Sequence, residues 1–527
     1  MKTQKGYLPR DTIYPFKGLN TLDPSPQANV QTSPDLVNMD ILKGALSKRR
    51  GYSFQGSTVT DPLLGVAEFE DSAGSKHQLA FTTRKQFQWS GSDWTEISNT
   101  SSTWTGSLAN PIEIVPVAGL DGSGNYKKLV LFTNGKDTPK YWDGITAKVS
   151  EFVPTGITNF KTFRSAAFFY DHLVLANVTL TTSVTQPNII YWSDTTTLFD
   201  FAGVNAGAVL LSDISGQIWK LVQLGDRLAI YAENSISTMT YVGGNAIYTF
   251  DKVVEDSRLV SMRGVVNISG FHLYMNQDNI IFFDGSKLLQ VVGDQIMRSY
   301  REELYVNGRT NAFAFHDFPK QRVYFNLPTG PSASKVYVME YNLLDKQNSS
   351  WVVHAYADQP TCMGSFSRDI SLRYNSSVLV GVTYNACNFT YNQATVKGGF
   401  PLRVFGTESG RVCLCDELVT SDAGEAIDSH YDTIDFTIPG EYQSAIARWI
   451  ELEFEARGFE TSVLYSTNQG KSFQSIEDVA LTGDWKRYKV FFDVSSDNMR
   501  FRFTNACLNS KFSVRWLRVW LRPGGPV

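Results

Sequence analysis

Three alternate glutamates, Glu451, Glu453 and Glu455, are the densest group of side chains in this sequence that could do chemistry. Two carboxylates can cleave a glycosidic bond when they flank a sugar from opposite sides at a set separation. These glutamates lie in the run RWIELEFEA, where Trp449 and the three glutamates alternate with apolar residues, which predicts a strand with one buried and one acidic face. Carboxylates on one face of one strand cannot flank a sugar. We therefore expect a solvated acidic face rather than a catalytic pair.

The other residues with catalytic or metal-binding potential are isolated. The sequence contains no H-E-x-x-H, G-x-S-x-G or G-x-x-x-x-G-K-[ST] motif, and its six histidines are scattered singly. Cys413 and Cys415 share one strand face but have no second pair of ligands at suitable spacing, which favours buried free thiols. We expect no catalytic residue, no cofactor and no metal site, and hence a protein that is not an enzyme.

The composition predicts an all-β chain of several parts. At 527 residues the chain is too long for one ordinary core, and it is rich in aromatic residues, Thr, Ser and Gly. A formal net charge of -4 argues against a protein that grips nucleic acid through a basic surface. The first residues lack the apolar core of a secretory signal, and no stretch approaches a membrane span, so we expect a soluble protein made in the cytoplasm.

A repeated four-strand pattern runs from about residue 61 to residue 420. Short apolar or aromatic runs alternate with Gly, Asn and Asp turns, and comparable turns recur roughly 40 to 55 residues apart. The stretch from Gln217 to Gly293 shows the pattern best, as two adjacent units. Four strands per unit at this period are typical of a β-propeller, for which we expect six or seven blades. Helical spacing of apolar residues and the stop signal Asn307-Gly308 predict one helical insertion near 294–306.

The two ends of the chain differ from this repeat. Residues 1–60 contain five scattered prolines in polar sequence, which predicts an extended arm held by its surroundings. Within the arm, SPDLVNMDILKGALSKRRGY ends in a basic cluster that is either a solvated turn or a docking segment for a neighbouring subunit. Residues 421–527 contain long alternating strands with a basic bias, which predicts a separate β-sandwich-like domain.

The order of these features resembles the tail nozzle, or tail hub, protein of short-tailed bacteriophages. The resemblance rests on SPDLVNMD…GALSKRRGY before the first blade and on the paired units GQIWKLVQLGDRLAIYAENSISTMTYVGG and SMRGVVNISGFHLYMNQDNIIFFDG. It also rests on IMRSYREEL followed by FAFHDFPKQRVYFNLP, and on the C-terminal VLYSTNQGKSF with its final aromatic and basic strands. These motifs cover most of the chain, although each is a loose pattern.

The resemblance implies a structural virion protein without catalytic residues. Six copies would form a ring below the portal and adaptor rings, contact tail fibre or tail needle proteins, and let double-stranded DNA pass without specific binding. Such a protein would assemble in the host bacterial cytoplasm, end in the virion tail and not insert into a membrane.

A ring of identical subunits needs contacts between different patches of each copy. We expect these patches in the arm and in the final strands; the candidate interface residues are Asp35, Asn38, Asp40, Arg49, Arg50, Arg515, Arg518 and Arg522. Glu451, Glu453 and Glu455 are candidates for an acidic channel wall, because such a wall would repel phosphate. On this hypothesis, deleting residues 1–52 abolishes ring assembly and leaves a folded monomer.

Two other classes of function stay open on the sequence alone. One is a propeller that binds or depolymerises carbohydrate, such as a receptor-binding tail component, which would be a monomer with affinity for glycans. The other is a cellular propeller that serves as a platform for protein contacts.

Overall fold

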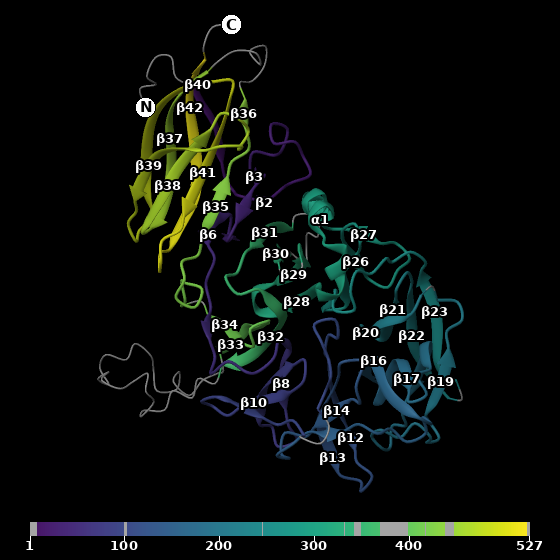
Figure 1. The fold of residues 1–527 in the computed structure, drawn as a ribbon. Coiled ribbons are helices and arrows are strands. Elements are labelled where there is room, and N and C mark those ends of the chain that lie inside the picture. Colours follow the sequence, from purple (N-terminus) through teal and green to yellow (C-terminus); the bar gives the residue numbers. More distant parts are fainter. Residues whose placement is uncertain are drawn as a thin grey trace.

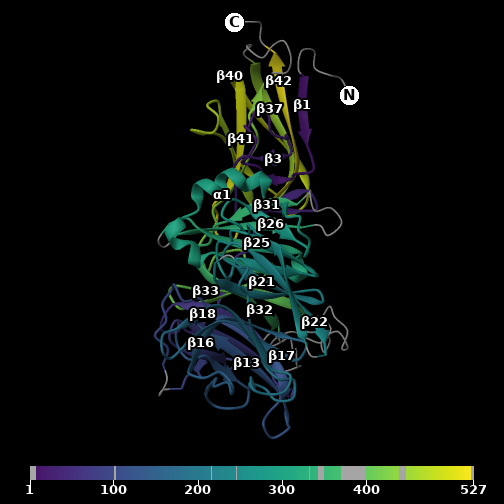
Figure 2. The same ribbon diagram turned by 90° about the vertical axis from the view of Figure 1, so that its right-hand side faces the viewer.

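The structure is a computed structural model that describes residues 8–99, 103–214, 216–244, 246–330, 333–341, 349–368, 399–416, 418–437 and 447–523. Strands dominate it, which confirms the prediction of an all-β chain. A group of four-stranded sheets lies at one end of an elongated molecule, and a two-layered part lies at the other end (Figures 1 and 2). Among these residues, no helix is long and apolar enough to cross a membrane.

Five antiparallel sheets of four strands follow one another along the chain. The first holds β8 (Leu63–Glu70), β9 (Lys76–Thr82), β10 (Gln86–Trp89) and β11 (Trp94–Glu96), and the second β12 (Glu113–Leu120), β13 (Tyr126–Thr133), β14 (Lys140–Trp142) and β15 (Ser150–Glu151). The third holds β16 (Phe160–Phe169), β17 (His172–Leu180), β18 (Thr185–Trp192) and β19 (Gly207–Leu210). The fourth holds β20 (Ile218–Leu224), β21 (Arg227–Ala232), β22 (Ile236–Gly243) and β23 (Ile247–Val254), and the fifth β24 (Val265–Ile268), β25 (Phe271–Met275), β26 (Ile280–Phe283) and β27 (Gln290–Val291).

Two further groups of four strands continue the series. The sixth is β28 (Phe313–Asp317), β29 (Arg322–Pro328), β30 (Ser334–Glu340) and β31 (Ser350–His354). The seventh is β32 (Pro360–Arg368), β33 (Gly399–Thr407), β34 (Val412–Cys415) and β7 (Ser53–Phe54), so a strand from before the first sheet completes the last one.

The first strand of each group contacts the first strand of the next. These contacts run from β8 through β12, β16, β20, β24 and β28 to β32, and β32 in turn contacts β8. Strands arranged in this way around a common axis are typical of a propeller. The prediction of a propeller-like array of four-stranded sheets therefore agrees with the structure.

The helical insertion is present where the sequence predicts it, but its α-helix covers only part of 294–306 and short 3-10 helices flank it. It consists of the one-turn helix η1 (Asp294–Ile296), α1 (Met297–Glu303) and the irregular helix η2 (Val306–Asn311), and a further single turn, η3 (Phe318–Lys320), forms the link between β28 and β29. The α-helix ends because Leu304 has extended backbone angles. Tyr300 is the buried residue of α1, and its hydroxyl donates to the carbonyl of Asn276 at 2.8 Å.

The strands of the N-terminal segment pair with strands from distant parts of the chain. They are β1 (Leu8–Ile13), β2 (Gly18–Leu19), β3 (Thr32–Ser33), β4 (Leu36–Val37), β5 (Met39–Leu42) and β6 (Ala45–Lys48). Strands β1 and β6 pair with the last strand of the chain, and β4 lies between β31 and a C-terminal strand. Proline has no backbone N–H to donate to a neighbouring strand, so the prolines keep these strands short without preventing them from pairing.

The C-terminal residues form two sheets that are completed by N-terminal strands. Their strands are β35 (Ser429–Asp432), β36 (Phe436–Thr437), β37 (Ala447–Gly458), β38 (Glu460–Ser466), β39 (Gln474–Ala480), β40 (Lys486–Ser496), β41 (Asn498–Asn505) and β42 (Phe512–Pro523). One sheet has the order β40-β37-β42-β6-β5, with β1 also on β42, and the other runs β31-β4-β35-β41-β38-β39. The second sheet is thus continuous with the sixth four-stranded group.

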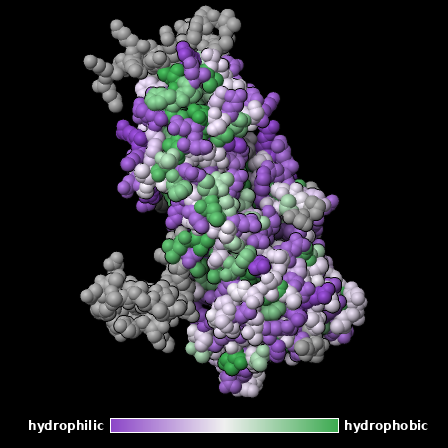
Figure 3. Space-filling view, turned by 60° about the vertical axis from the view of Figure 1, so that its left-hand side comes forward, coloured by the Kyte–Doolittle hydropathy of each residue, from purple (hydrophilic) through white to green (hydrophobic). Residues whose placement is uncertain are grey.

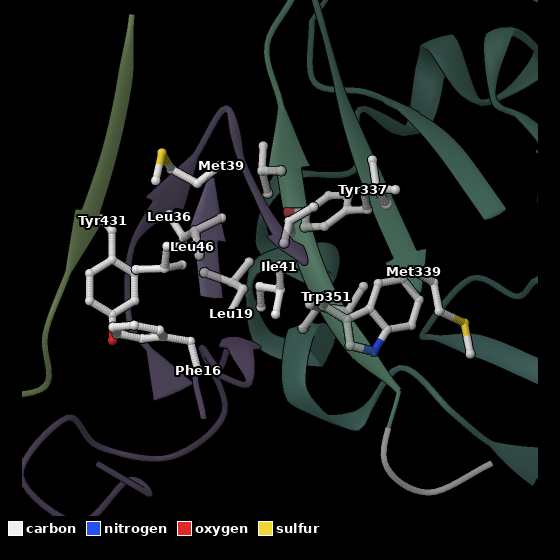
Figure 4. Packing of buried hydrophobic residues seen from close by; sticks show 14 of the residues in the cluster. Phe16, Leu19, Leu36, Met39, Ile41, Leu46, Tyr337, Met339, Trp351 and Tyr431 are labelled. Atoms are coloured by element: carbon white, nitrogen blue, oxygen red, sulfur yellow. The ribbon is translucent and has the colours of Figure 1, made fainter. Parts of the chain in front are cut away.

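A single buried apolar cluster joins the two ends of the molecule. It includes residues of the N-terminal strands, of β29 to β31 and of the C-terminal sheets. Figure 4 shows Phe16, Leu36, Met39 and Leu46 between Tyr431 on one side and Trp351 on the other. The cluster contains residues from both sides of the boundaries that the sequence suggests near residues 60 and 420. The N-terminal strands therefore belong to a core that the two ends of the molecule share.

Candidate interaction face on the C-terminal sheet

Glu451, Glu453 and Glu455 lie on the outer face of the sheet β40-β37-β42, in the central strand β37. Glu451 and Glu455 are partly exposed, whereas neighbouring side chains bury Glu453. Trp449, expected on the same face, is buried instead. The strand register shifts between Trp449 and Glu451 against both neighbouring strands, so a bulge at Ile450 moves Trp449 to the core side. Strict alternation could not predict this bulge.

Basic residues of both neighbouring strands flank the glutamate row. Glu453 lies opposite Lys489 on β40 and opposite Arg518 on β42. Lys489 donates to Glu451 at 2.6 Å, and this hydrogen bond raises the pKa of the lysine. The row is therefore a charge-compensated strip, and the role of Glu451, Glu453 and Glu455 as an acidic channel wall stays a prediction.

Tryptophan rings alternate with these charges. The indole nitrogen of Trp516 donates to Glu455 at 2.8 Å, and the guanidinium carbons of Arg487 and Arg518 lie 5.5 and 5.9 Å from the centre of its ring. Cations at such distances are attracted to the face of an aromatic ring. The ring of Trp485 also lies close to arginine side chains.

Trp485 lies beside two further arginines. The guanidinium carbon of Arg457 is 4.8 Å from the centre of its ring, and that of Arg515 is 5.9 Å away. Phe491, on the same face of β40, is 68% exposed. We call the face formed by Phe491, Arg487, Lys489, Glu451, Glu453, Glu455, Arg457, Trp485, Arg515, Trp516 and Arg518 the outer sheet face. In one view of the surface, apolar and polar side chains are interleaved over this end of the molecule (Figure 3).

The outer sheet face suits binding rather than bond cleavage. Aromatic rings next to arginines are enriched at protein interfaces, and they carry much of the binding energy there. The three carboxylates belong to one strand, so no pair of them faces another across a substrate-sized gap. The geometry therefore supports contact with a partner surface or with a chain-like ligand.

The candidate interface residues of the N-terminal segment lie inside the molecule. Asp40 is 8% exposed and binds Arg322 at 3.1 Å and the Nε2 atom of His354 at 2.8 Å. Burial opposes the ionisation of Asp40, but these two partners hold its pKa well below the usual range. Asp40 thus stabilises the chain internally and is not available to a neighbouring subunit.

Arg49 is also buried, with 2% of its surface exposed. It donates two hydrogen bonds to the carboxylate of Asp422, at 2.8 and 2.6 Å, and a third to the side chain of Asn38 at 2.6 Å. Asn38 in turn accepts from the backbone of Ala355 at 2.8 Å. Arg49 of the basic cluster is therefore the centre of an internal junction, which corrects both expectations for this residue, the solvated turn and the docking segment.

The remaining candidate interface residues lie in different places in the structure. Asp35 is only partly buried and binds Arg502 of the same chain at 2.8 Å, and Arg50 is partly exposed. Arg515 and Arg518 lie on the outer sheet face, and the side chain of Arg522 lies outside the described residues. The structure thus brings Arg515 and Arg518 together with Glu455, and it separates them from Asp40 and Arg49.

Sequence reasoning missed Trp485, Arg487 and Lys489 as members of the outer sheet face. A partial signal was available, since Arg487, Lys489 and Phe491 alternate with Tyr488, Val490 and Phe492, but Trp485 lies before this alternation. The pairing of these two strands depends on contacts across the sheet, which alternation alone does not specify.

No protein-family model matches this sequence, and neither does any curated protein. Among solved structures, the extracellular domain of the putative one component system BT4673 from B. thetaiotaomicron is 8% identical, with a TM-score of 0.41 over 89% of this chain and 61% of the other. An exo-β-1,3-galactanase from Phanerochaete chrysosporium is 10% identical, with a TM-score of 0.26 over 89% and 100% of the two chains. A family 29 carbohydrate-binding module is 13% identical, with a TM-score of 0.15 over 19% and 67%. With TM-scores of 0.41 or less, these three structures indicate neither the fold nor the function of this chain.

Proposed function

We propose that this chain is a non-catalytic structural subunit, the tail nozzle of a short-tailed bacteriophage, and that copies of it meet through the outer sheet face. The observation that carries the proposal is the position of SPDLVNMD…GALSKRRGY, the first of the motifs that resemble the nozzle family. Its residues Asp40 and Arg49 lie buried at the junction of the propeller-like and C-terminal parts. A subunit that bears load along its length needs such a junction.

We further infer that the seven groups of four strands form a closed seven-bladed propeller. The support is the series of contacts between successive first strands, which returns from β32 to β8. Strand β7 completes the seventh group and directly precedes the first, so it fastens the two ends of the propeller together. Closure of this kind removes the free edges that a linear array would leave.

The outer sheet face has the composition of an interface patch. Its tryptophans and arginines are partly exposed, and its charges of both signs can specify a partner by complementarity. In a ring each copy would present this face to a different patch of its neighbour. The remaining partners of the proposal are an adaptor ring and tail fibre or tail needle proteins, with double-stranded DNA passing through, in a virion tail assembled in the host cytoplasm without insertion into a membrane.

Negative-stain microscopy and mass measurement of the purified chain test this proposal. The wild-type chain is expected to form rings, and the double charge reversal Arg515→Glu with Arg518→Glu should shift the population to monomers. Arg84→Glu, at an exposed arginine of the propeller-like part, is the matched control and should leave rings intact. Rings that survive the double reversal would exclude the outer sheet face as the contact.

Binding of carbohydrate is the second candidate function. The observation in its favour is that Trp485 and Trp516 are partly exposed on one sheet face beside carboxylates and guanidinium groups. Aromatic rings can stack on sugars while the polar groups bind hydroxyls. A monomer that binds a glycan array, and loses this binding in Trp516→Ala, would favour this candidate over the nozzle.

A further inference from the structure

Two tyrosine rings are stacked on the surface of the propeller-like part. Tyr170 lies in the turn between β16 and β17, and Tyr241 lies near the end of β22, in the next group of four strands (Figure 1). The centres of their rings are 4.8 Å apart, and the planes of the rings differ by 18°. The two residues are 48% and 43% exposed. We call this pair the tyrosine stack; neither ring belongs to the outer sheet face.

Two further aromatic rings hold the tyrosine stack from behind. The ring of Phe169 meets that of Tyr170 edge-on, with centres 4.7 Å apart, and the ring of Tyr248 meets that of Tyr241 edge-on at 5.6 Å. Phe169 and Tyr248 are buried, and the hydroxyl of Tyr248 donates to the carbonyl of Phe169 at 3.2 Å. These contacts join the two hairpins and fix the orientation of the exposed rings.

The turn that carries Tyr170 has a strained backbone. The φ angle is +48° at Tyr170 and +62° at Asp171, which are the two residues between β16 and β17. Tight hairpin turns with two such angles favour Asn and Gly, because most other residues are strained there. The corresponding turns of the next two groups each contain a glycine with positive φ, Gly225 and Gly270. The third group instead displays an aromatic ring and a carboxylate.

Packing does not account for the carboxylate in this turn. Asp171 is exposed, and among the described residues no basic group forms an ion pair with it. Strained residues are retained where the surrounding structure or a ligand requires them. The glycines at the corresponding turns show that this fold also accepts an unstrained residue at such a turn. The strain at an exposed tyrosine and aspartate therefore points to a ligand.

The chemistry of this surface matches the ring of a pyranose sugar. An aromatic ring stacks on the apolar C–H face of the sugar, while a carboxylate and phenol hydroxyls bind its hydroxyl groups. Burial raises the pKa of Tyr248, and the tyrosine stack and Asp171 raise it further, so these polar groups lie near one another. A stable protein interface buries about 800 Å² on each partner, which is far more than two half-exposed tyrosines offer.

We propose that the tyrosine stack is a binding site for a pyranose sugar, whose C–H face packs on the exposed tyrosine surface while one of its hydroxyls donates to Asp171. This site is separate from the carbohydrate-binding candidate described above, which uses Trp485 and Trp516 at the other end of the molecule. It does not depend on the assembly of rings and goes beyond the proposed function.

Saturation-transfer difference NMR of the full chain tests the site with the methyl pyranosides of glucose, galactose, mannose and N-acetylglucosamine. At least one of them should bind at millimolar concentration, with the strongest transfer to ring C–H protons on one face of the sugar. Sorbitol, a linear polyol without such a face, should bind about tenfold more weakly than this sugar. Binding of none of the four at millimolar concentration, or equal binding of sorbitol, would overturn the proposal.

Two substitutions in the strained turn assign the site. Tyr170→Asn keeps a residue that suits the turn but removes the ring, and should weaken sugar binding about tenfold. Asp171→Gly should also weaken binding, but should raise the melting temperature by about 2 °C, because it relieves the strain. Unchanged binding in Tyr170→Asn, or no rise in the melting temperature of Asp171→Gly, would contradict the proposal.

Two control variants separate this site from other surfaces. Ser269→Asn changes the corresponding turn of the fifth group, where Ser269 is exposed and also has a positive φ, and it should leave sugar binding unchanged. Trp516→Ala should likewise leave it unchanged. Loss of binding in Trp516→Ala with full binding in Tyr170→Asn would place the sugar on the outer sheet face and overturn the assignment to the tyrosine stack.

Discussion

Arg49 and Asp422 form a two-point ion pair across 373 positions of sequence, with hydrogen bonds of 2.8 and 2.6 Å. Their side chains are 1% and 3% exposed. The pair connects the N-terminal segment to the beginning of the C-terminal part, and Arg49 also donates to the backbone of Ala355, just after β31, at 2.5 Å. The guanidinium group of Arg49 therefore joins three regions of the chain: the N-terminal segment, the residues just after β31 and the beginning of the C-terminal part.

Replacing this arginine should strongly destabilise the protein. Arg49→Met leaves the carboxylate of Asp422 buried without a counter-ion, which typically costs about 3 to 5 kcal/mol of unfolding free energy. Denaturant unfolding followed by circular dichroism measures the loss. Arg448→Met is the control, because Arg448 and its partner Asp493 are more than half exposed, and a surface pair contributes only about 0 to 1 kcal/mol. Equal losses in the two variants would contradict the role given to Arg49.

Deletion of residues 1–52 should prevent folding rather than release a folded monomer. The deletion removes Phe16, Leu36, Met39 and Leu46 from the shared apolar cluster and leaves Asp422 unpaired. The expected result is insoluble protein or a chain without a cooperative unfolding transition. A soluble, cooperatively folded product would restore the sequence-based hypothesis of a detachable arm.

Gly18 should not tolerate a side chain. Its φ is +94°, and a Cβ atom there would lie 2.4 Å from the carbonyl oxygen of Trp351, its neighbour on β31. Gly74 has a similar φ of +82° but no atom within 4 Å of a built Cβ. Gly74→Ala should therefore lower the unfolding free energy only by the backbone strain, about 1 to 2 kcal/mol. Gly18→Ala should lower the unfolding free energy clearly more. Thermal unfolding compares the two, and equal shifts would exclude the close approach of β2 and β31.

Stability should fall as the pH drops below about 6.5, in part because of His272. Burial lowers the pKa of His272 in the folded protein to about 4, although its hydrogen bond to the carbonyl of Gln223 opposes the shift. Between these values the unfolded chain binds a proton that the folded chain does not, so unfolding free energy is lost at up to about 1.4 kcal/mol per pH unit. Below pH 4 His272 is protonated in both the folded and the unfolded state. The stabilisation that neutral His272 provides is then fully lost, and the unfolding free energy no longer changes with pH through this residue.

The variant His272→Gln keeps a donor for Gln223 and removes the titrating group. Its unfolding free energy should depend less on pH between 6.5 and 4 than that of the wild type. Some dependence should remain, because burial also lowers the pKa of His354 to about 4. Superimposable pH profiles of the variant and the wild type would refute the assignment to His272.

Local patterns in the sequence predict much of the fold. Alternating apolar residues and Gly or Asp turns correctly indicate a series of four-stranded sheets, since hairpin neighbours are close in sequence. The same reasoning fails for β7 and β4, because a strand of two residues has no periodicity and its partners lie far along the chain. Asp40 and Arg49 look like surface charges in the sequence, and only their distant partners Arg322 and Asp422 make burial possible.

The outer sheet face could be predicted in part. The glutamates are evident as alternating charges, but Arg515 and Arg518 are three residues apart and share their face only because the register of β42 shifts at Arg515. The mutual neutralisation of these charges depends on strand order, which places β37 between β40 and β42.

The most direct test of the structural-subunit proposal is negative-stain microscopy of the purified chain, in parallel with the Arg515→Glu, Arg518→Glu double variant. The account predicts closed rings for the wild type, six-fold if the resemblance to the nozzle family holds, and isolated elongated particles for the variant. A wild-type chain that stays monomeric at all concentrations, and binds glycans through Trp516, would contradict it.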